Sequence, residues 1–465
     1  MAIAEQLAER IVRMKYEDLP AEAIRWAKIS FIDTIGCALA GIAEEAPRIA
    51  QKVLTTGKGT GPSLIWGTAR RATALDAASI NGTATHALDY DDCNNSIAGH
   101  PSVALLPASL ALAEELGASG RDVILAYVAG FETQGRIGRA VHVHHYEKGW
   151  HPTATLGVFG AAAASARLLG LDAERTAAAL AIACSLASGI KANFGTMTKP
   201  LHAGECTRNG LYAALLAKEG FTASPEAFEH KHGFFEVFNG AGNYQAEKAF
   251  ESWANPLEIL DPGVGLKQYP CCGSTHSAID AMLLLRERHQ LTPEKVAKIE
   301  SITHQRALAH TDRPDPRSTL DAKFSVQYCV ARALMHGEVT FEHFEGETYR
   351  DAAVRNLLQR IEARPHAHQP NGMYEHFQGE VVVTTTSGER LSARVDQPLR
   401  GPTNLAPPDR LEQKFKDCAA KALADGSIAR IYDMLQKFET LGDVRRLTDA
   451  MAESTLPDSR VLAAA

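Results

Sequence analysis

The sequence predicts a mainly α-helical protein that carries a smaller α/β segment inserted near its C-terminal end. Apolar side chains recur at helical spacing through about the first 250 residues, and the same pattern returns from Asp409 onward. Between these regions, KIESITH at 298–304 and EVVVTTTSGERLSARV at 380–395 are rich in β-branched residues and contain a Ser-Gly turn, as strands and a hairpin do. We therefore predict a helical domain over 1–258 and 405–460, and an α/β domain over 259–404.

Helical periodicity places the individual elements in order. Pro20 opens a helix that Gly41 closes, since proline suits a first turn and glycine a helix end. Two segments rich in alanine and glycine, 160–170 and 177–189, are expected to be central helices, because small residues let helices approach closely. The helices predicted for the first domain are 3–14, 21–41, 74–88, 103–117, 121–134, 153–169, 172–188 and 207–219. In the second domain we expect helices at 277–289 and 322–336, and we expect the last ten residues to fray.

Composition narrows the function. The formal net charge is −7 and no dense Lys/Arg run occurs, which argues against nucleic-acid and anionic-membrane partners. Eight scattered cysteines without a secretory start indicate free thiols in a reducing compartment. No apolar run reaches the roughly 20 residues that a membrane span needs. We therefore expect a soluble, cytoplasmic protein.

One stretch, HALDYDDCNNSIAGHPS at 86–102, combines three aspartates, a cysteine and two histidines. Glycine and proline flank His100 and restrict its backbone, which is how a chain aims an ionisable side chain. Four further segments set ionisable residues among Gly, Pro, Ser or Thr: GWHPTATLG (149–157), FGTMTKPLHAG (194–204), GLKQYPCCGSTHS (265–277) and KFSVQYC (323–329). Their candidate residues, with His100, are His151, Lys199, His202, Lys267, His276 and Tyr328.

Most of these candidates can be cationic, so together they would form a positive pocket in an acidic protein, suited to small multiply charged carboxylates. Histidine and lysine also suit the removal of a proton next to a carboxylate, because they supply both a base and donors for the enolate-like charge. Each residue alone also has a structural explanation, such as a hydrogen-bonded turn histidine or a solvated lysine.

A metal site is the main alternative. Asp89, Asp91 and Asp92 could bind a divalent cation or merely cap helices, and His142, His144 and His145 could join them. However, neither HExxH nor a regular Cys/His spacing occurs, so we predict no metal. The absence of GxGxxG and GxSxG likewise removes support for nicotinamide, flavin and the simplest hydrolase mechanism.

Four motifs in this order resemble the MmgE/PrpD family, which includes 2-methylcitrate dehydratase, cis-aconitate decarboxylase and iminodisuccinate epimerase. They are NGTATHALDYDD with HPS (81–102), GWHPTATLG, TKPLHAG followed by GLYAALLAKEGFT, and YPCCGSTH. The resemblance implies a large all-helical domain with an inserted α/β lid domain, a homodimer, and no metal or organic cofactor. By matching motifs it implies active-site positions for Asp89, His100, His151, Lys199, His276 and Tyr328, and we assign substrate contacts to Cys93, His202 and Lys267.

Two details bear on the substrate. Family members commonly have Asp-Asp-Thr where this chain has Asp91-Asp92-Cys93, so a thiol, a weaker hydrogen-bond donor, replaces a hydroxyl. After His-Pro-Ser, VALLPASLALAEELG resembles the decarboxylase and epimerase branches more than the dehydratases, in which a polar SDN is usual.

The resulting hypothesis is a cofactor-independent lyase that abstracts a proton α to a carboxylate of a small di- or tricarboxylate, as a cis-aconitate decarboxylase or 2-methylcitrate dehydratase would. An epimerase using the same site is the first alternative. A non-catalytic polycarboxylate-binding protein and a metal-dependent hydrolase are the others. The sequence does not choose between dehydration, decarboxylation and epimerisation, because all three need the same cationic pocket.

Overall fold

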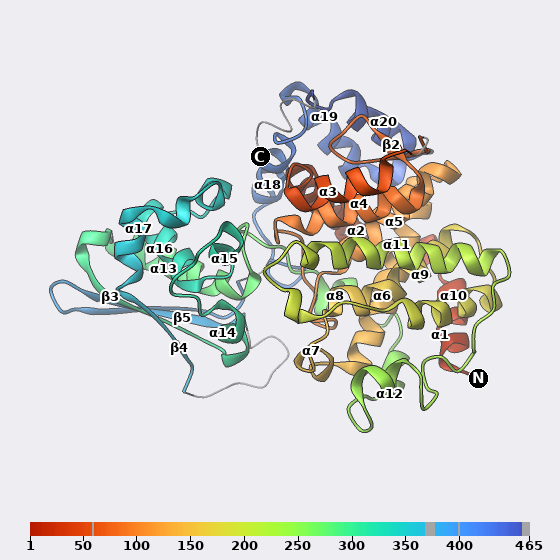
Figure 1. Cartoon of the computed structure of the whole chain (residues 1–465), viewed down its shortest axis with the longest axis horizontal. Coiled ribbons are helices and arrows are strands. Elements are labelled where there is room, and N and C mark those ends of the chain that lie inside the picture. Colours follow the sequence, from red (N-terminus) through yellow and green to blue (C-terminus); the bar gives the residue numbers. More distant parts are fainter. Residues whose placement is uncertain (58–59, 368–376, 399, 458–465) are drawn as a thin grey trace. The chain divides into compact units, whose positions relative to one another are not determined.

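The computed structural model describes residues 1–57, 60–367, 377–398 and 400–457 (Figure 1). The chain divides into two compact units: unit 1 comprises Met1–Gly265 and Ala406–Ala465, and unit 2 comprises Leu266–Leu405. Unit 1 is helical apart from one short two-stranded pairing, and unit 2 holds a four-stranded sheet with helices. The fold is therefore mainly α-helical with a small α/β part, as predicted. Most of the C-terminal segment expected to fray lies outside the described residues.

Long helices make up most of unit 1. Its first part contains α1 (Ile3–Arg13), α2 (Ala21–Gly41), α3 (Glu45–Thr55), α4 (Ala74–Ala87), α5 (Pro101–Leu116), α6 (Gly120–Val141), α9 (Gly157–Leu168), α10 (Ala173–Leu186) and α11 (Thr198–Lys218). Shorter helices are α7 (His144–Glu147), α8 (Pro152–Thr155) and α12 (Phe234–Asn239). The C-terminal part adds α18 (Pro408–Ala419), α19 (Asp425–Gln436) and α20 (Arg445–Glu453).

Close packing of small residues holds the centre of unit 1 together. Helix α11 contacts α4 and α9. A Cβ atom added at Gly210 of α11 would lie 2.3 Å from the Ala161 Cβ of α9, and one at Gly204 would lie 2.4 Å from the Ser79 carbonyl oxygen of α4. Both distances are shorter than non-bonded contacts allow, so these helices approach at a separation that requires glycine. The alanine-rich helix α9 is buried along almost its whole length, as predicted for a central helix.

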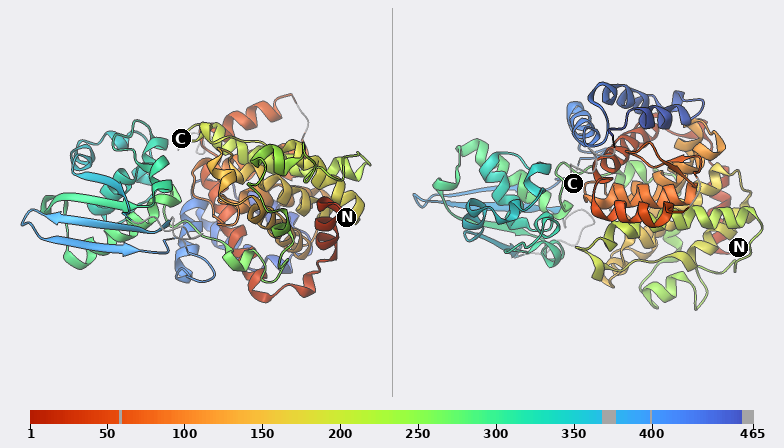
Figure 2. Two further views of the ribbon diagram at one scale, coloured as in Figure 1. Left: turned by 90° about the horizontal axis from the view of Figure 1, so that it is seen from below. Right: turned by 45° about the horizontal axis from the view of Figure 1, so that its top comes forward.

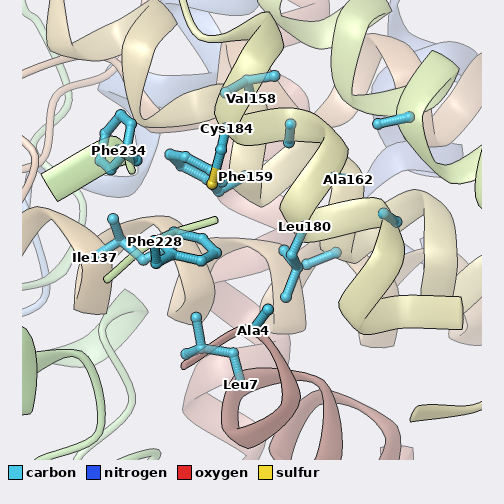
Figure 3. Packing of buried hydrophobic residues seen from close by; sticks show 14 of the residues in the cluster. Ala4, Leu7, Ile137, Val158, Phe159, Ala162, Leu180, Cys184, Phe228 and Phe234 are labelled. Atoms are coloured by element: carbon cyan, nitrogen blue, oxygen red, sulfur yellow. The ribbon is translucent and has the colours of Figure 1, made fainter. Parts of the chain in front are cut away.

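Side chains of α1, α6, α9 and α10 form an aromatic and aliphatic cluster with Phe228 and Phe234 (Figure 3). Phe159 packs edge to face on Phe234 with ring centroids 4.8 Å apart, and its ring is tilted by 39° against that of Phe228 at 5.0 Å. Leu7 of α1 and Leu180 of α10 close the cluster from other helices. Such burial supplies the main free energy that stabilises this part of the unit.

Three helix boundaries in unit 1 differ from the prediction. Helix α6 runs on to Val141, and the predicted helix at 153–169 is two helices, α8 and α9, that meet at Leu156. Helix α11 begins at Thr198 rather than 207, because Pro200 falls in its first turn, where a missing N–H costs nothing. Lys199 and His202 therefore lie on a helix.

Unit 2 is built on a sheet with strand order β4-β3-β5-β6. The strands are β3 (Val296–Thr303), β4 (Ile361–Pro365), β5 (Gly379–Thr385) and β6 (Arg390–Val395); β3 and β4 are parallel and the other pairs antiparallel. The predicted strand and hairpin are confirmed as β3 and β5–β6, with Gly388 in the left-handed region (φ 88°) of the connecting turn. Strand β4 was not predicted, because five residues give too short a pattern.

The helices of unit 2 are α13 (His276–His289), α14 (Gln305–Thr311), α15 (Thr319–Lys323), α16 (Val326–His336) and α17 (Ala352–Leu358). Helix α13 packs on β5, β6 and α16. Buried and exposed residues alternate along β6, and the left view of Figure 2 shows the strands with helices beside them. The predicted helix at 322–336 is interrupted at Ser325, whose hydroxyl accepts a hydrogen bond from the Tyr328 backbone and so caps α16.

Among the described residues, no single helix has the length and apolar character to cross a membrane. Helices α2 and α3 reach that length and composition only as a pair, and the pair is bent by 86°.

The C-terminal helix α18 is joined to α2 by a buried ion pair. The Lys414 Nζ atom lies 2.6 Å from Asp33 Oδ1 and 2.9 Å from the Tyr90 carbonyl oxygen, which it binds as a donor. It also lies 3.8 Å from the centre of the Tyr90 ring. Burial alone would lower the pKa of Lys414, but the Asp33 charge outweighs it and raises that pKa. Through Tyr90, the pair fixes the loop that follows α4.

Replacing Lys414 with methionine should leave Asp33 as an uncompensated buried charge and lower the free energy of unfolding of unit 1 by about 3–5 kcal/mol. All four tryptophans lie in unit 1, so urea unfolding followed by tryptophan fluorescence reports on this unit. Lys416→Met is the matched control, because Lys416 pairs with Glu412 on the exposed side of the same helix. This substitution should lower the free energy of unfolding by less than about 1 kcal/mol. If the two substitutions lowered the free energy of unfolding equally, the stabilising role of the buried Lys414–Asp33 pair would be contradicted.

Candidate active site

Three segments of unit 1 bring a lysine, four histidines and two aspartates into one cluster. The first is the end of α4 with the loop that follows it, the second is the loop before α8, and the third is the first turn of α11. The cluster contains His86, Asp89, Asp91, His100, His151, Lys199 and His202.

Lys199 lies at the centre of this cluster, and only 5% of its surface is exposed. Its Nζ atom is 2.6 Å from Asp89 Oδ1 and 2.8 Å from His86 Nε2. The Phe194 ring lies on another side, 5.6 Å from Nζ to the centroid. A buried ammonium needs such charge-assisted hydrogen bonds to offset its lost hydration.

Asp89 adopts a left-handed backbone conformation, with φ 53°. Asp is one of the few residues with a side chain that tolerates this region, and positive φ values recur where a fold holds a functional group in place. The conformation turns the chain directly after α4, so that the Asp89 carboxylate reaches Lys199.

His86 and Asp91 also belong to the cluster. The sequence analysis gave His86 no role, and it considered Asp91 only as a possible cation ligand or helix cap. His86 Nδ1 lies 2.9 and 3.0 Å from the two Asp91 carboxylate oxygens. Burial is the largest cause that lowers the pKa of His86; Lys199 lowers it further and Asp91 opposes the shift. The only signal in the sequence was an aspartate five residues after a histidine at a helix end, a spacing that identifies no contact by itself.

His100 is fixed by its own loop. Its Nδ1 atom lies 2.8 Å from the Asp92 carbonyl oxygen, which can only accept, so Nδ1 donates. Nε2 then faces Asp89 Oδ1 at 3.7 Å. The His100 backbone N–H donates to Thr153 Oγ1 (3.1 Å), which ties this loop to α8.

His151 precedes α8 and contacts His202 of α11, with their Nδ1 atoms 3.1 Å apart. Burial, followed by the charges of Lys199 and His86, holds the pKa of His151 well below its usual value. Burial and then His86 and Lys199 lower the pKa of His202 to about 4. Both imidazoles are therefore neutral near pH 7, where a neutral ring can accept or donate a proton.

Cys93 lies beside the cluster and is half-buried. Its Sγ atom is 3.9 Å from His100 Nδ1, and its backbone pairs with Gly265 through hydrogen bonds of 2.7 and 2.8 Å. The assignment of Cys93 to substrate binding stays a prediction.

Three predicted site residues lie in unit 2. His276 begins α13 and is fully buried, with Nε2 3.3 Å from the Cys271 carbonyl oxygen. Lys267 is also buried. The Tyr328 hydroxyl donates to the His343 carbonyl oxygen (2.5 Å) and accepts from Arg332 Nε (2.9 Å) within the unit. The assignment of Tyr328 as a proton donor stays a prediction.

The metal alternative can be tested against the donor atoms. His86, Asp89, Asp91 and His100 each offer a ligand atom, and these atoms lie within 4.8 Å of one another. Lys199 already contacts two of the four, and its positive charge would repel a divalent cation. His144 and His145 instead contact Asn239 and Thr155. The residues therefore fit a built-in ammonium better than a metal ion.

Family models match most of the chain: the MmgE/PrpD N-terminal domain matches residues 5–247, and the MmgE/PrpD C-terminal domain matches 269–440. The chain is 31% identical over 470 residues to cis-aconitate decarboxylase of Homo sapiens, which covers 98% of this chain and 96% of the relative. It is 25% identical over 457 residues to cis-aconitate decarboxylase of Aspergillus terreus (94% and 93%). It is 24% identical over 374 residues to 2-methylcitrate dehydratase of Salmonella typhimurium strain LT2 (75% and 74%).

Replacing Lys199 with methionine should raise the pKa of His202 above its value of about 4, because a nearby positive charge that disfavours the imidazolium is removed. Burial, the largest cause of the shift, and His86 remain in the variant and keep this pKa below the ordinary 6.5. NMR titration of labelled histidines from pH 8 to 4, with His202→Gln for assignment, measures the change. Lys218→Met, at the exposed far end of the same helix, should leave that pKa in place. An unaltered His202 titration in the Lys199 variant would show that Lys199 does not control the site's electrostatics.

Proposed function

Because the chain belongs to the MmgE/PrpD family, we propose that it is a lyase acting on a small di- or tricarboxylate at a carbon next to a carboxylate, without a metal or organic cofactor. The relatives that match over most of their length carry the names cis-aconitate decarboxylase and 2-methylcitrate dehydratase. Both names denote lyases. Loss of CO2 or of a proton from such substrates leaves negative charge on carbon, conjugated with a carboxylate.

The observation that carries this proposal is the Lys199 ammonium, buried against Asp89 and surrounded by the imidazoles of His86, His100 and His151. A cation at this place can bind a substrate carboxylate and stabilise the enolate-like charge as it forms. The neutral imidazole of His151 beside it can take up or deliver the proton that the reaction moves.

We assign the roles as follows. Lys199 binds a substrate carboxylate and stabilises negative charge, and Asp89 orients Lys199. His100 and His151 exchange the proton with carbon. His276 and Tyr328 are proposed as further catalytic groups, with Tyr328 as a donor. Cys93, His202 and Lys267 are proposed substrate contacts.

Decarboxylation is the favoured outcome. The decarboxylase relatives align over 93% or more of their length, whereas the bacterial dehydratase aligns over 74%. Dehydration is the second candidate, because a 2-methylcitrate dehydratase is among the relatives and shares the need for a cationic pocket.

Incubation with cis-aconitate, 2-methylcitrate and iminodisuccinate separately in D2O should yield CO2 and a deuterated product from a cis-aconitate-like substrate. NMR and mass spectrometry distinguish this outcome from loss of water, which indicates a dehydratase, and from exchange without loss of mass, which indicates an epimerase. Calorimetric binding across the panel without any product would instead favour a binding protein. Activity that chelator abolishes and a divalent metal restores would overturn the metal-free proposal.

Lys199→Met and His151→Gln should each lower kcat by about 100-fold or more, the range expected for a lost acid–base or charge-stabilising group. His289→Gln, on the exposed end of α13, is the control. If both site variants stay within about threefold of wild type, a difference of about 0.65 kcal/mol, the site assignment is wrong.

The expected homodimer is part of the proposal. Ile49 and Val53 of α3, and Leu201 and Tyr212 of α11, are large apolar side chains that are exposed in a single chain, and burial against a second copy would be favourable. Light scattering after size-exclusion chromatography should give twice the chain mass of 50.1 kDa. A monomer mass at micromolar concentration would contradict the expected homodimer.

A further inference from the structure

His86 is held between a carboxylate and an ammonium, deep inside unit 1. Its Nδ1 atom lies 2.9 Å from Asp91 Oδ2, and its Nε2 atom lies 2.8 Å from Lys199 Nζ. All three side chains are at most 5% exposed. The roles assigned above leave both His86 and Asp91 unused, although Lys199 depends on their contacts.

The chemistry of these contacts determines where the His86 proton lies. Carboxylate oxygens accept hydrogen bonds, so the hydrogen must be on Nδ1, which faces Asp91. Burial and Lys199 lower the pKa of His86, which keeps the ring neutral. Nε2 therefore presents a lone pair to Lys199, and the ammonium donates to it.

Lys199 thus has two of its three N–H bonds directed by the protein, one to Asp89 and one to His86. Fixing two of these bonds also fixes the direction of the third. Without such contacts, a lysine ammonium on a flexible four-carbon stem points in no single direction.

We propose that Asp91 and His86 form a buried positioning pair: Asp91 sets the tautomer of His86, and His86 sets the orientation of the Lys199 ammonium toward substrate. This proposal deepens the proposed function and rests on it for its effect on turnover. His86 and Asp91 act through Lys199, so both are positioning residues. Their loss should act on kcat through the orientation of the ammonium.

A double-mutant cycle separates this role from simple packing. In Asp91→Asn, the new amide can donate to Nδ1, which would place the hydrogen on Nε2 and set it against the ammonium. In serine proteases, the wrong tautomer caused by such a change lowers kcat by about 10⁴-fold. We expect Asp91→Asn to lower kcat by at least about 100-fold here. In a His86→Gln background, the Gln carbonyl can still accept from Lys199 and no tautomer exists, so adding Asp91→Asn should lower kcat much less than it does alone. Any remaining loss reports the second contact of Asp91, whose Oδ2 atom lies 3.4 Å from His100 Nδ1.

His145 and Asn239 provide a matched control cycle. His145 is equally buried, with Nδ1 2.9 Å from Asn239 Oδ1 and Nε2 2.7 Å from Thr155 Oγ1, so its second nitrogen faces a hydroxyl where that of His86 faces an ammonium. In this control cycle, the effect of Asn239→Asp on kcat should be the same with and without His145→Gln. Circular dichroism and thermal unfolding identify any variant that fails to fold.

A second measurement tests the pair without any variant having to be active. Nitrogen NMR of labelled histidine at pH 7, with His86 assigned through His86→Gln, should show the hydrogen on Nδ1 and a bare Nε2. A hydrogen on Nε2, or equal costs of Asp91→Asn in both backgrounds, would overturn the proposal. If no substrate is turned over but the tautomer is as stated, the proposed function fails while the Asp91–His86–Lys199 geometry holds.

Discussion

Burial of one positive charge is the constraint on which the site depends. An ammonium removed from water costs several kcal/mol unless a charged partner and further hydrogen bonds compensate. Lys199 receives that compensation from Asp89 and His86, which both come from the end of α4 and its following turn. The loop at 86–102 is therefore shaped by the requirement to satisfy a lysine more than 100 residues away. The left-handed conformation of Asp89 is part of that arrangement.

The scaffold makes this contact possible through close helix packing. A Cβ atom added at Gly82 of α4 would lie 2.9 Å from the Cα atom of Gly204 in α11, so the two helices approach backbone to backbone. Gly82 lies one turn before His86, and Gly204 lies a little over one turn after Lys199. A larger residue at either glycine would push α4 and α11 apart and lengthen the His86–Lys199 contact. The small residues of the bundle thus set a distance in the site as well as filling the core.

Local signals in the sequence were enough to predict the helical and α/β parts, the β5–β6 hairpin and most of the cluster, because Gly and Pro beside His100, His151 and Lys199 mark restrained backbone. They could not predict the His86–Asp91 pair, which forms only once the turn at Asp89 folds back. Nor could KFSVQYC reveal that the Tyr328 hydroxyl faces the His343 carbonyl oxygen, since partner choice depends on packing within unit 2. Pro200 concealed the start of α11, because proline ends helices as often as it begins them.

The charge that serves the substrate also controls the bases. Burial is the largest cause that lowers the pKa of His151 and of His202, and the charge of Lys199 lowers both further, so without substrate both rings are neutral but weakly basic. A substrate carboxylate against Lys199 would bring negative charge to the same place and offset that influence, which raises both pKa values toward the ordinary 6.5 for histidine. The proton affinity of His151 would then rise as the substrate binds. One buried lysine can in this way link carboxylate binding to acid–base strength, and it needs no moving part to do so.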